Sequence, residues 1–348
     1  RRLSIPTAYV RIDRSRFLNL SRSGGPHDCH PCRTSCWNRH SVLRSAIFFV
    51  LIAKSEDHSP LTSLTSRNAH DIDDQERPTL GRVFDVQNLS FGYDGRQVLS
   101  GFDFSASAGE FVGLVGPNGT GKTTLIRLMS GVLKQKGGLV EILGSRLDRM
   151  RATERARLVS VVPQNPRTPS GLTAWDLVLL GRNPHLGMLQ WEGKNDAEIA
   201  HEAMVATSTD ELANRDLDSL SGGERQRVLI AMALAQQCPV MLLDEPTSNL
   251  DIAHQPAIME LLTNLKSRED SVVVVAMHDL TLAAQYCNRI VVIREGRNFA
   301  DGRPQDVLTE EIIQNVYGVK VRILTHPDTG MPVIVGANNA GQSRRNED

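Results

Sequence analysis

The fold of this chain is decided by Gly116-Pro117-Asn118-Gly119-Thr120-Gly121-Lys122-Thr123, with Thr124 directly behind it. This stretch matches the pattern G-x-x-x-x-G-K-[ST], in which a glycine-rich turn joins a strand to a helix and wraps backbone N–H groups around phosphate oxygens. The flanking sequence has the required character, because the apolar residues 111–115 precede the turn and the helix-forming residues 125–129 follow it. We therefore predict a phosphate-binding loop.

Each residue type in this loop has its own chemical role. Gly116, Gly119 and Gly121 let main-chain N–H groups turn toward a β-phosphate, and the start of the next helix adds partial positive charge. Lys122 places a point charge on the β- and γ-phosphate oxygens, and the Thr123 hydroxyl is suited to bind Mg²⁺. A glycine-rich turn can also be only a tight connection, but the Lys-Thr pair at this offset favours the phosphate site.

Composition bounds the class of protein. A chain of 348 residues can hold one large or two ordinary domains. Its 39 Lys and Arg residues and 40 Asp and Glu residues leave a formal net charge of −1, so the global charge does not indicate a nucleic-acid partner. The longest early apolar run, residues 46–53, is much shorter than the ~20 residues that cross a bilayer. We expect any membrane role to come through a partner.

Residues 1–80 differ from the rest of the chain. The first 45 residues contain nine arginines but no lysine and only two acidic residues, and the first methionine is Met129. We expect residues 1–80 to be disordered, or to be a non-native extension that is either processed or translated from upstream of the real start.

The five cysteines divide into two groups. Cys29, Cys32 and Cys36 have a spacing and histidine neighbours that invite a zinc interpretation, but their stretch lacks the second half of any familiar zinc pattern. Cys238 and Cys287 stand alone among apolar residues and are most simply small core residues.

After residue 81 the sequence alternates between strand-like and helix-like runs. Residues 83–93 and the short run Val98-Leu99 predict two antiparallel strands around an Asp94-Gly95 turn, followed by residues 101–106. Tyr93 ends the first of these strands, where it could stack on an adenine or be a half-buried strand tyrosine. Further apolar runs predict strands at residues 139–144, 158–162, 240–243 and 271–276, and residues 173–215 are predicted to be mainly helical.

Polar side chains follow the predicted buried strands. Asp244 and Glu245 end one of them, at the position where a doubly wound sheet places its ligand. Asp244 can hold Mg²⁺ through water, and Glu245 can orient or deprotonate an attacking water. Gln164 ends an earlier strand and can reach the metal, while His278 ends a later one and can donate a hydrogen bond to a γ-phosphate. Each could also be a structural or solvated strand end, but their order after Lys122 favours a site.

A second anion-binding element begins at Ser221-Gly222-Gly223, ahead of a helix-like run that extends to Gln237. Unpaired N–H groups and the helix dipole would face outward there, although an ordinary helix cap is the simpler interpretation. One phosphate loop does not need a second anion site in the same chain, unless two chains share their nucleotides.

Taken in order, these motifs resemble the ATP-binding cassette (ABC) ATPase family over residues 83–320. The resemblance identifies Tyr93 as the A-loop aromatic, residues 116–123 as Walker A and Gln164 as the Q-loop. It identifies Ser221-Gly222-Gly223-Glu224-Arg225-Gln226 as the signature and Asp244-Glu245 as the end of Walker B. Residues 248–251, with Asp251, match the D-loop, and His278 matches the switch histidine.

The resemblance implies an α/β fold, namely a P-loop NTPase core with a parallel sheet, an antiparallel β subdomain and a helical subdomain. The ATPase domain would span residues 81–320, with the helical subdomain at about 165–226 and a C-terminal tail at 321–348. ATP would bind with Mg²⁺, which Thr123 and Gln164 would hold directly and Asp244 through water. Glu245, His278 and Gln164 would be the catalytic residues.

The resemblance also implies partners. In a homodimer, Ser221, Gly222, Gly223 and Gln226 of one chain would act in trans on ATP held by the other. The dimer would lie peripherally on the cytoplasmic face of the inner membrane, under a separate permease fed by an extracytoplasmic solute-binding protein, with no nucleic acid.

A finer similarity concerns the cargo. Residues 176–185, 251–255 and 317–319 look like importer ATPases for ferric siderophores, haem or vitamin B12, although Asn183 stands where a tyrosine is expected. The expected function is therefore ATP hydrolysis that powers uptake of an iron chelate or cobalamin. The alternatives are a soluble cassette ATPase that acts on ribosomes or DNA, and an exporter subunit.

Overall fold

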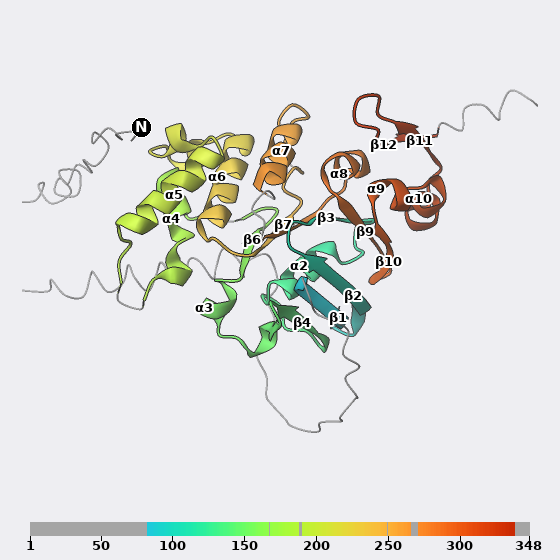
Figure 1. Cartoon of the computed structure of the whole chain (residues 1–348), viewed down its shortest axis with the longest axis horizontal. Helices are drawn as coiled ribbons and strands as arrows, with labels where there is room; N and C mark the ends of the chain where they lie inside the picture. The colour runs from blue at the N-terminus through green and yellow to red at the C-terminus, as the bar shows by residue number, and fades with distance from the viewer. Residues whose placement is uncertain (1–81, 167, 188–189, 249, 266–270, 338–348) are drawn as a thin grey trace, which may run out of the picture. The chain divides into compact units, whose positions relative to one another are not determined.

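The computed structural model describes residues 82–337 except 167, 188–189, 249 and 266–270. The predictions for residues 1–80, including the zinc interpretation of Cys29, Cys32 and Cys36, lie outside the described residues. Within the described part, the strands form three sheets, of six, four and two strands (Figure 1).

The six-stranded sheet carries the loops that matter for function. Its order is β10-β9-β3-β8-β7-β6, with β10 antiparallel to β9 and all other neighbours parallel. The carboxyl ends of parallel strands meet at one edge, so the loops that follow β3, β6, β7 and β8 lie near each other. The strands are β3 (Phe111–Val115), β6 (Val159–Val162), β7 (Val240–Asp244), β8 (Val272–Ala276), β9 (Arg289–Arg294) and β10 (Arg297–Gly302).

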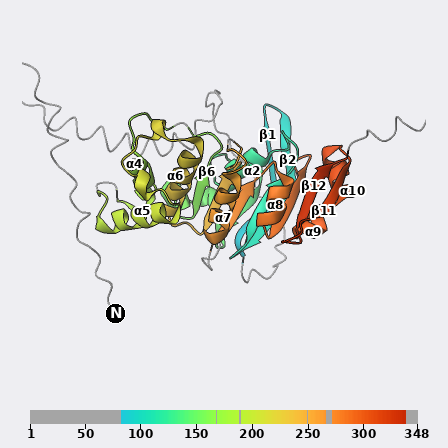
Figure 2. The same cartoon turned by 90° about the horizontal axis from the view of Figure 1, so that it is seen from above.

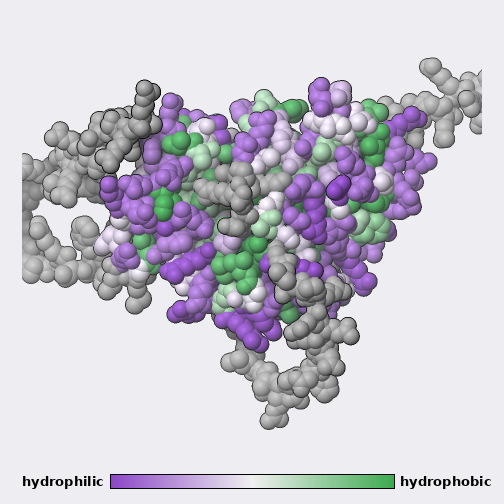
Figure 3. Space-filling model, viewed as in Figure 1, coloured by the Kyte–Doolittle hydropathy of each residue, from purple (hydrophilic) through white to green (hydrophobic). Residues whose placement is uncertain are grey.

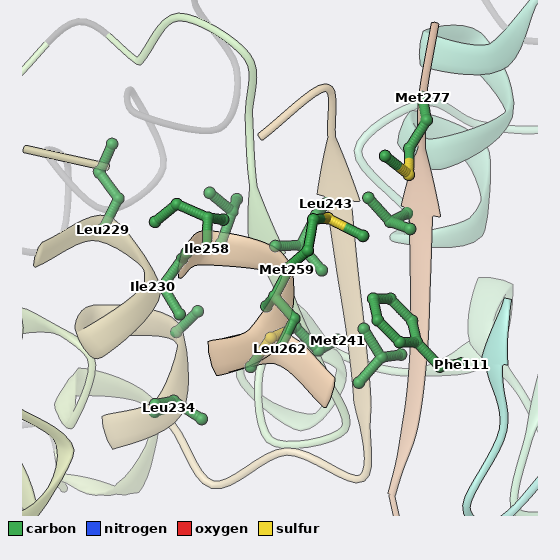
Figure 4. Packing of buried hydrophobic residues seen from close by; sticks show 14 of the residues in the cluster. Phe111, Leu229, Ile230, Leu234, Met241, Leu243, Ile258, Met259, Leu262 and Met277 are labelled. Carbon is green, nitrogen blue, oxygen red and sulfur yellow. The ribbon is translucent and has the colours of Figure 1, made fainter. Parts of the chain in front are cut away.

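Both faces of this sheet are covered, which explains the unbroken apolar runs. Side chains alternate along a strand, so Met241 and Leu243 of β7 join one buried cluster while Leu242 joins the other. Helices α6 (Gly222–Ala235) and α7 (Gln255–Leu265) pack on the first face. Figure 4 shows Leu229, Ile230 and Leu234 of α6 and Ile258, Met259 and Leu262 of α7 gathered near Met241 and Leu243 of β7.

The opposite face is covered by α2 (Lys122–Met129) and by the four-stranded antiparallel sheet, with order β2-β1-β4-β5. Asp94 and Gly95 both have positive φ, which confirms the predicted hairpin turn. Val98-Leu99 and residues 101–106, which the sequence suggested as separate stretches, form one longer, bulged strand. The strands are β1 (Arg82–Tyr93), β2 (Arg96–Ser107), β4 (Gly137–Ile142) and β5 (Ser145–Arg146).

The region predicted as helical contains α4 (Ala174–Leu180) and α5 (Lys194–Ala206), which pack on each other and on α6. Arg182 is buried among them, where its Nε donates to Asp196 (3.0 Å) and its Nη1 to the Ala235 carbonyl (2.8 Å). His185 bonds to the Gln236 carbonyl (2.8 Å). Arg182 and His185, which follow α4, thus link the end of that helix to the start of α5 and the end of α6. The remaining short elements are α3 (Ala152–Arg155) and 3₁₀ turns at Leu147–Arg149, Asn183–His185, Asp210–Leu212 and Leu217–Ser219.

The stretch expected as a C-terminal tail begins with a β-hairpin. Strands β11 (Val321–Thr325) and β12 (Pro332–Gly336) pair with each other, and the Ile334 N–H donates to the Thr281 hydroxyl on α8 (3.0 Å). Figure 2 shows β12 beside α8. Contact with α8, which the pattern of residues 321–336 does not reveal, supports the hairpin. The helices of this region are α8 (Leu280–Tyr286), α9 (Pro304–Val307) and α10 (Glu310–Tyr317).

The surface is mainly polar. On the face seen in Figure 3, hydrophilic residues predominate and hydrophobic ones appear in small groups between them, as is ordinary for a folded domain. None of the helices in the described ranges is long and apolar enough to cross a membrane.

Candidate active site

The predicted phosphate loop connects β3 to α2 at the carboxyl edge of the central sheet. A Cβ atom at Gly116 would collide with the Ile293 carbonyl oxygen on β9, so only glycine lets the loop approach the sheet this closely. Gly121 caps α2 with φ of +99°, a conformation that other L residues rarely adopt. The first N–H groups of α2 have no partner within the helix, which creates an anion site above the loop.

Lys122 is buried and bends over its own loop. Its Nζ donates to the carbonyls of Gly116 (2.7 Å) and Pro117 (3.2 Å). Burial lowers the pKa of Lys122, and the neighbouring carboxylates of Glu245 and Asp244 partly restore it. The ammonium group therefore rests on two neutral acceptors beside two acidic residues, where a phosphate group would be a stronger partner.

Asp244 ends β7 and faces the phosphate loop. The Thr123 hydroxyl donates to its Oδ1 (3.0 Å). Burial raises the pKa of Asp244, and the adjacent Glu245 raises it further, although the Thr123 bond opposes both effects. Two neighbouring acidic groups with a hydroxyl beside them form an oxygen-rich place that a hard divalent cation would suit. Within the described ranges, no group of three His, Cys, Asp or Glu residues could hold a metal ion by itself, this place included.

Ionisation of the buried Asp244 carboxyl group costs free energy in the folded state. We therefore predict that Asp244→Asn stabilises the protein when nucleotide and Mg²⁺ are absent. A folded-state pKa raised above the unfolded value gives a stabilising contribution that is present below the unfolded pKa and lost as pH rises through the folded pKa. The wild-type protein therefore loses this contribution as its carboxyl group ionises, whereas asparagine never ionises. We expect the apo Tm to rise by about 2–4 °C while ATPase activity falls.

The measurement is a thermal melt between pH 4 and 8, with Asp210→Asn at an exposed position as the matched control. A lower apo Tm in Asp244→Asn at pH 7 would show that the buried carboxylate stabilises the fold and would contradict this reading of the site.

Glu245 is held from three sides. Its backbone has φ of +51°, and its N–H donates to the Ala276 carbonyl on β8 (3.0 Å). The Gln164 amide donates to one carboxylate oxygen, and His278 Nε2 contacts the other. A non-glycine residue in this strained conformation is typical of functional sites. The structure thus brings together Gln164, Glu245 and His278, which follow three different strands.

The start of α6 presents Ser221 and Gly222 at the surface. Ser221 caps the helix, since its hydroxyl accepts from the Glu224 N–H (3.3 Å) and donates to the Glu224 carboxylate (2.8 Å). Gly223 is half-buried beside His254. These residues can offer helix N–H groups to an anion from outside the chain.

Gln226 differs from the other signature residues because it turns inward. It is buried, its amide nitrogen has no hydrogen-bond partner, and it lines a cavity of about 160 Å³ with Gln164 and Glu245. The apolar pattern of α6 could have shown this, since Leu229 and Ile230 follow Gln226 at helical spacing on the buried face. In this conformation its side chain is directed to its own chain.

Two further predicted residues are partly exposed. Tyr93 ends β1 and packs edge-to-face on Phe91, with ring centroids 4.9 Å apart. Tyr93 is 36% exposed, so part of its ring is available for stacking. Asp251 is exposed ahead of α7, and its carbonyl accepts the His254 N–H (2.8 Å).

A glycine loop with a buried lysine, set at the carboxyl edge of a parallel sheet beside two acidic residues, defines a P-loop nucleotide-binding protein. The comparisons with known proteins narrow this class. Residues 99–248 match the family model described as ABC transporter.

The relatives agree with that match. The chain is 38% identical over 250 residues to the siderophore transport system ATP-binding protein YusV of Bacillus subtilis (strain 168). This alignment covers 72% of this chain and 91% of the relative. It is 40% identical over 248 residues to the cobalamin import ATP-binding protein BtuD of Halobacterium salinarum. That alignment covers 71% of this chain and 62% of the relative. The chain belongs to the ABC transporter ATP-binding family.

The fold of this chain is also similar to that of a solved structure. It shows an ABC transporter of the metal-chelate type in an inward-facing conformation, with a TM-score of 0.65, 27% identity and coverage of 74% of this chain and 99% of that chain. The family, the α/β fold class and the ATPase activity that the motifs predicted are thereby confirmed.

Proposed function

We propose that this chain is the ATP-hydrolysing subunit of an importer that takes up a metal chelate through a separate membrane permease. The observation that carries the proposal is the meeting of Gln164 and His278 on the Glu245 carboxylate, beside the Thr123–Asp244 pair. Glu245, which can accept a proton, thus lies next to the phosphate loop together with Gln164 and His278, which contact its carboxylate.

Hydrolysis would use these residues in a defined order. Loop N–H groups and Lys122 bind the β- and γ-phosphates, and Tyr93 stacks on the adenine. Glu245 orients the attacking water and takes its proton, while His278 donates a hydrogen bond toward the γ-phosphate. Mg²⁺ held by Thr123, by Gln164 and through water by Asp244 would neutralise the phosphate oxygens.

Completion of the site would require a second copy of the chain. The hydrogen bonds of the Ser221 hydroxyl stay within its own capping box, and the N-terminus of α6 is exposed. An outward anion site and a separate phosphate loop in the same chain suit a homodimer, in which α6 of one copy closes over ATP held by the other. Asp251 would lie at the same interface.

The cargo is inferred from the relatives. One is named for siderophore transport and one for cobalamin import, and the similar solved structure is of the metal-chelate type. Siderophore complexes and cobalamin are both metal chelates, and we place a ferric siderophore or haem first. The permease would bind the dimer at the cytoplasmic face of the inner membrane, and a solute-binding protein would deliver the cargo from outside.

The test is transport in proteoliposomes that contain this chain with the permease subunits that co-purify with it. We expect ATP-dependent uptake of a radiolabelled ferric siderophore, and none when the chain carries Lys122→Ala. Uptake of cobalamin instead would change the cargo within the proposed class. Co-purification with ribosomes, or ATP-driven efflux, would favour one of the two alternative functions and contradict the proposal.

A further inference from the structure

Gln226 has a buried amide group whose nitrogen makes no hydrogen bond. The residue is only 9% exposed, and its Nε2 has no acceptor among the residues that the structure describes. Leu229 and Ile230 follow it on the buried face of α6, where an apolar side chain of similar length would pack without an unpaired donor. Native proteins rarely leave a buried donor without a partner. The amide therefore indicates a polar partner in the space beside it.

That space is the cavity of about 160 Å³ where α6 meets the ends of β6 and β7. Gln226 of α6, Gln164 after β6 and Glu245 after β7 all line it. Arg225 links the start of α6 to the segment that follows Gln164, because its Nη2 donates to the Thr168 hydroxyl. A buried water needs roughly 10–15 Å³ of such a space and polar groups to bond with. The cavity therefore has both the room and the polar lining to hold water.

Glu245 supplies the acceptor that such a water requires. Gln164 Nε2 donates to one oxygen of its carboxylate, and His278 Nε2 contacts the other. A carboxylate oxygen can accept more than one hydrogen bond, so Glu245 keeps acceptor capacity toward the cavity. A water that accepts from Gln226 Nε2 and donates to Glu245 would satisfy both buried groups, and bridges of this kind are nearly as favourable as direct bonds.

We propose that Gln226 is a positioning residue for Glu245 of its own chain and acts through water held in this cavity. The water accepts a hydrogen bond from the Gln226 amide and donates one to the carboxylate, which adds a third contact to those of Gln164 and His278. A carboxylate fixed in this way stays in the orientation that takes a proton from the attacking water. Gln226 thereby serves the ATP bound to its own chain, unlike the exposed Ser221. The proposal rests on the proposed role of Glu245 as general base.

The test compares Gln226→Met with wild type in two measurements on the full chain, kcat from phosphate release and the Kd for a fluorescent ATP analogue. Methionine keeps a side chain of similar length but donates no hydrogen bond. We expect kcat to fall roughly 3- to 10-fold, the factor for about one hydrogen bond, while the Kd stays within about 2-fold of wild type. Leu229→Met is the matched control, because it places the same side chain on the same wall of the cavity, and it should change neither quantity.

A double-mutant cycle separates positioning from packing. If Gln226 acts through the Glu245 carboxylate, Gln226→Met should slow single-turnover hydrolysis in the wild-type background and slow Glu245→Gln little further. A residue that only packs would reduce the rate by the same factor in both backgrounds.

An unchanged kcat in Gln226→Met would overturn the proposal. Equal losses in the two backgrounds, or a loss that Leu229→Met shares, would also overturn it, because each would assign the effect to packing. Normal turnover in Glu245→Gln would instead contradict the general base of the proposed function. The two failures are therefore distinguishable.

Discussion

Glu245→Gln is expected to stop ATP turnover while ATP still binds. The carboxylate is the one acidic side chain that both Gln164 and His278 contact, and an amide in its place keeps the shape but cannot take a proton from water. Loss of a general base typically costs about 10²- to 10⁴-fold in rate. We expect kcat to fall by that factor and the Kd for ATP to stay within about 3-fold of wild type, since glutamine keeps the size of the side chain and the change affects about one hydrogen bond.

The matched control is Glu295→Gln. Glu295 has the same positive φ of 51° and lies in the exposed turn between β9 and β10, so it tests the backbone effect of the substitution without the chemistry. Steady-state phosphate release measures both variants. Normal turnover in Glu245→Gln would remove this residue from the mechanism.

Lys122→Ala is expected to weaken nucleotide binding itself. Lys122 is the buried cation between the loop carbonyls and the two carboxylates, so its removal leaves phosphate charge next to Asp244 and Glu245 without compensation. Hydrogen bonds to charged groups contribute about 1.5–3 kcal/mol each, which corresponds to roughly 10- to 100-fold in Kd. Equilibrium titration with a fluorescent ATP analogue measures the change.

Lys134→Ala serves as the control for this variant, since Lys134 is an exposed lysine soon after the end of α2. It should bind ATP like wild type. Near-normal affinity in Lys122→Ala would show that the loop backbone alone holds the phosphates and would contradict the role given to the lysine.

Much of the fold could be predicted because the signals were local. The apolar runs that became β3, β7 and β8 are buried on both faces, and such strands have unbroken apolar sequences. The turn at Asp94 and Gly95 has a similarly local cause. The hairpin at residues 321–336 was not predicted, because its support comes from α8, about 50 residues earlier in the chain.

The candidate site was predictable in its residues but not in its contacts. Motif order indicated Gln164, Glu245 and His278, yet only the sheet order β8-β7-β6 makes them neighbours. The apolar pattern of α6 could have shown the inward turn of Gln226, but Gln164 and Glu245 lie 81 positions apart in the chain. No spacing rule covers such a separation.

Two copies of this chain are proposed to share each ATP. The most direct test is the molar mass of Glu245→Gln by light scattering after size exclusion, with Mg-ATP and with Mg-ADP. We expect a mass of two chains with Mg-ATP and of one chain with Mg-ADP, and loss of the ATP-bound pair when Ser221→Arg is added. A mass of one chain at saturating ATP would contradict it.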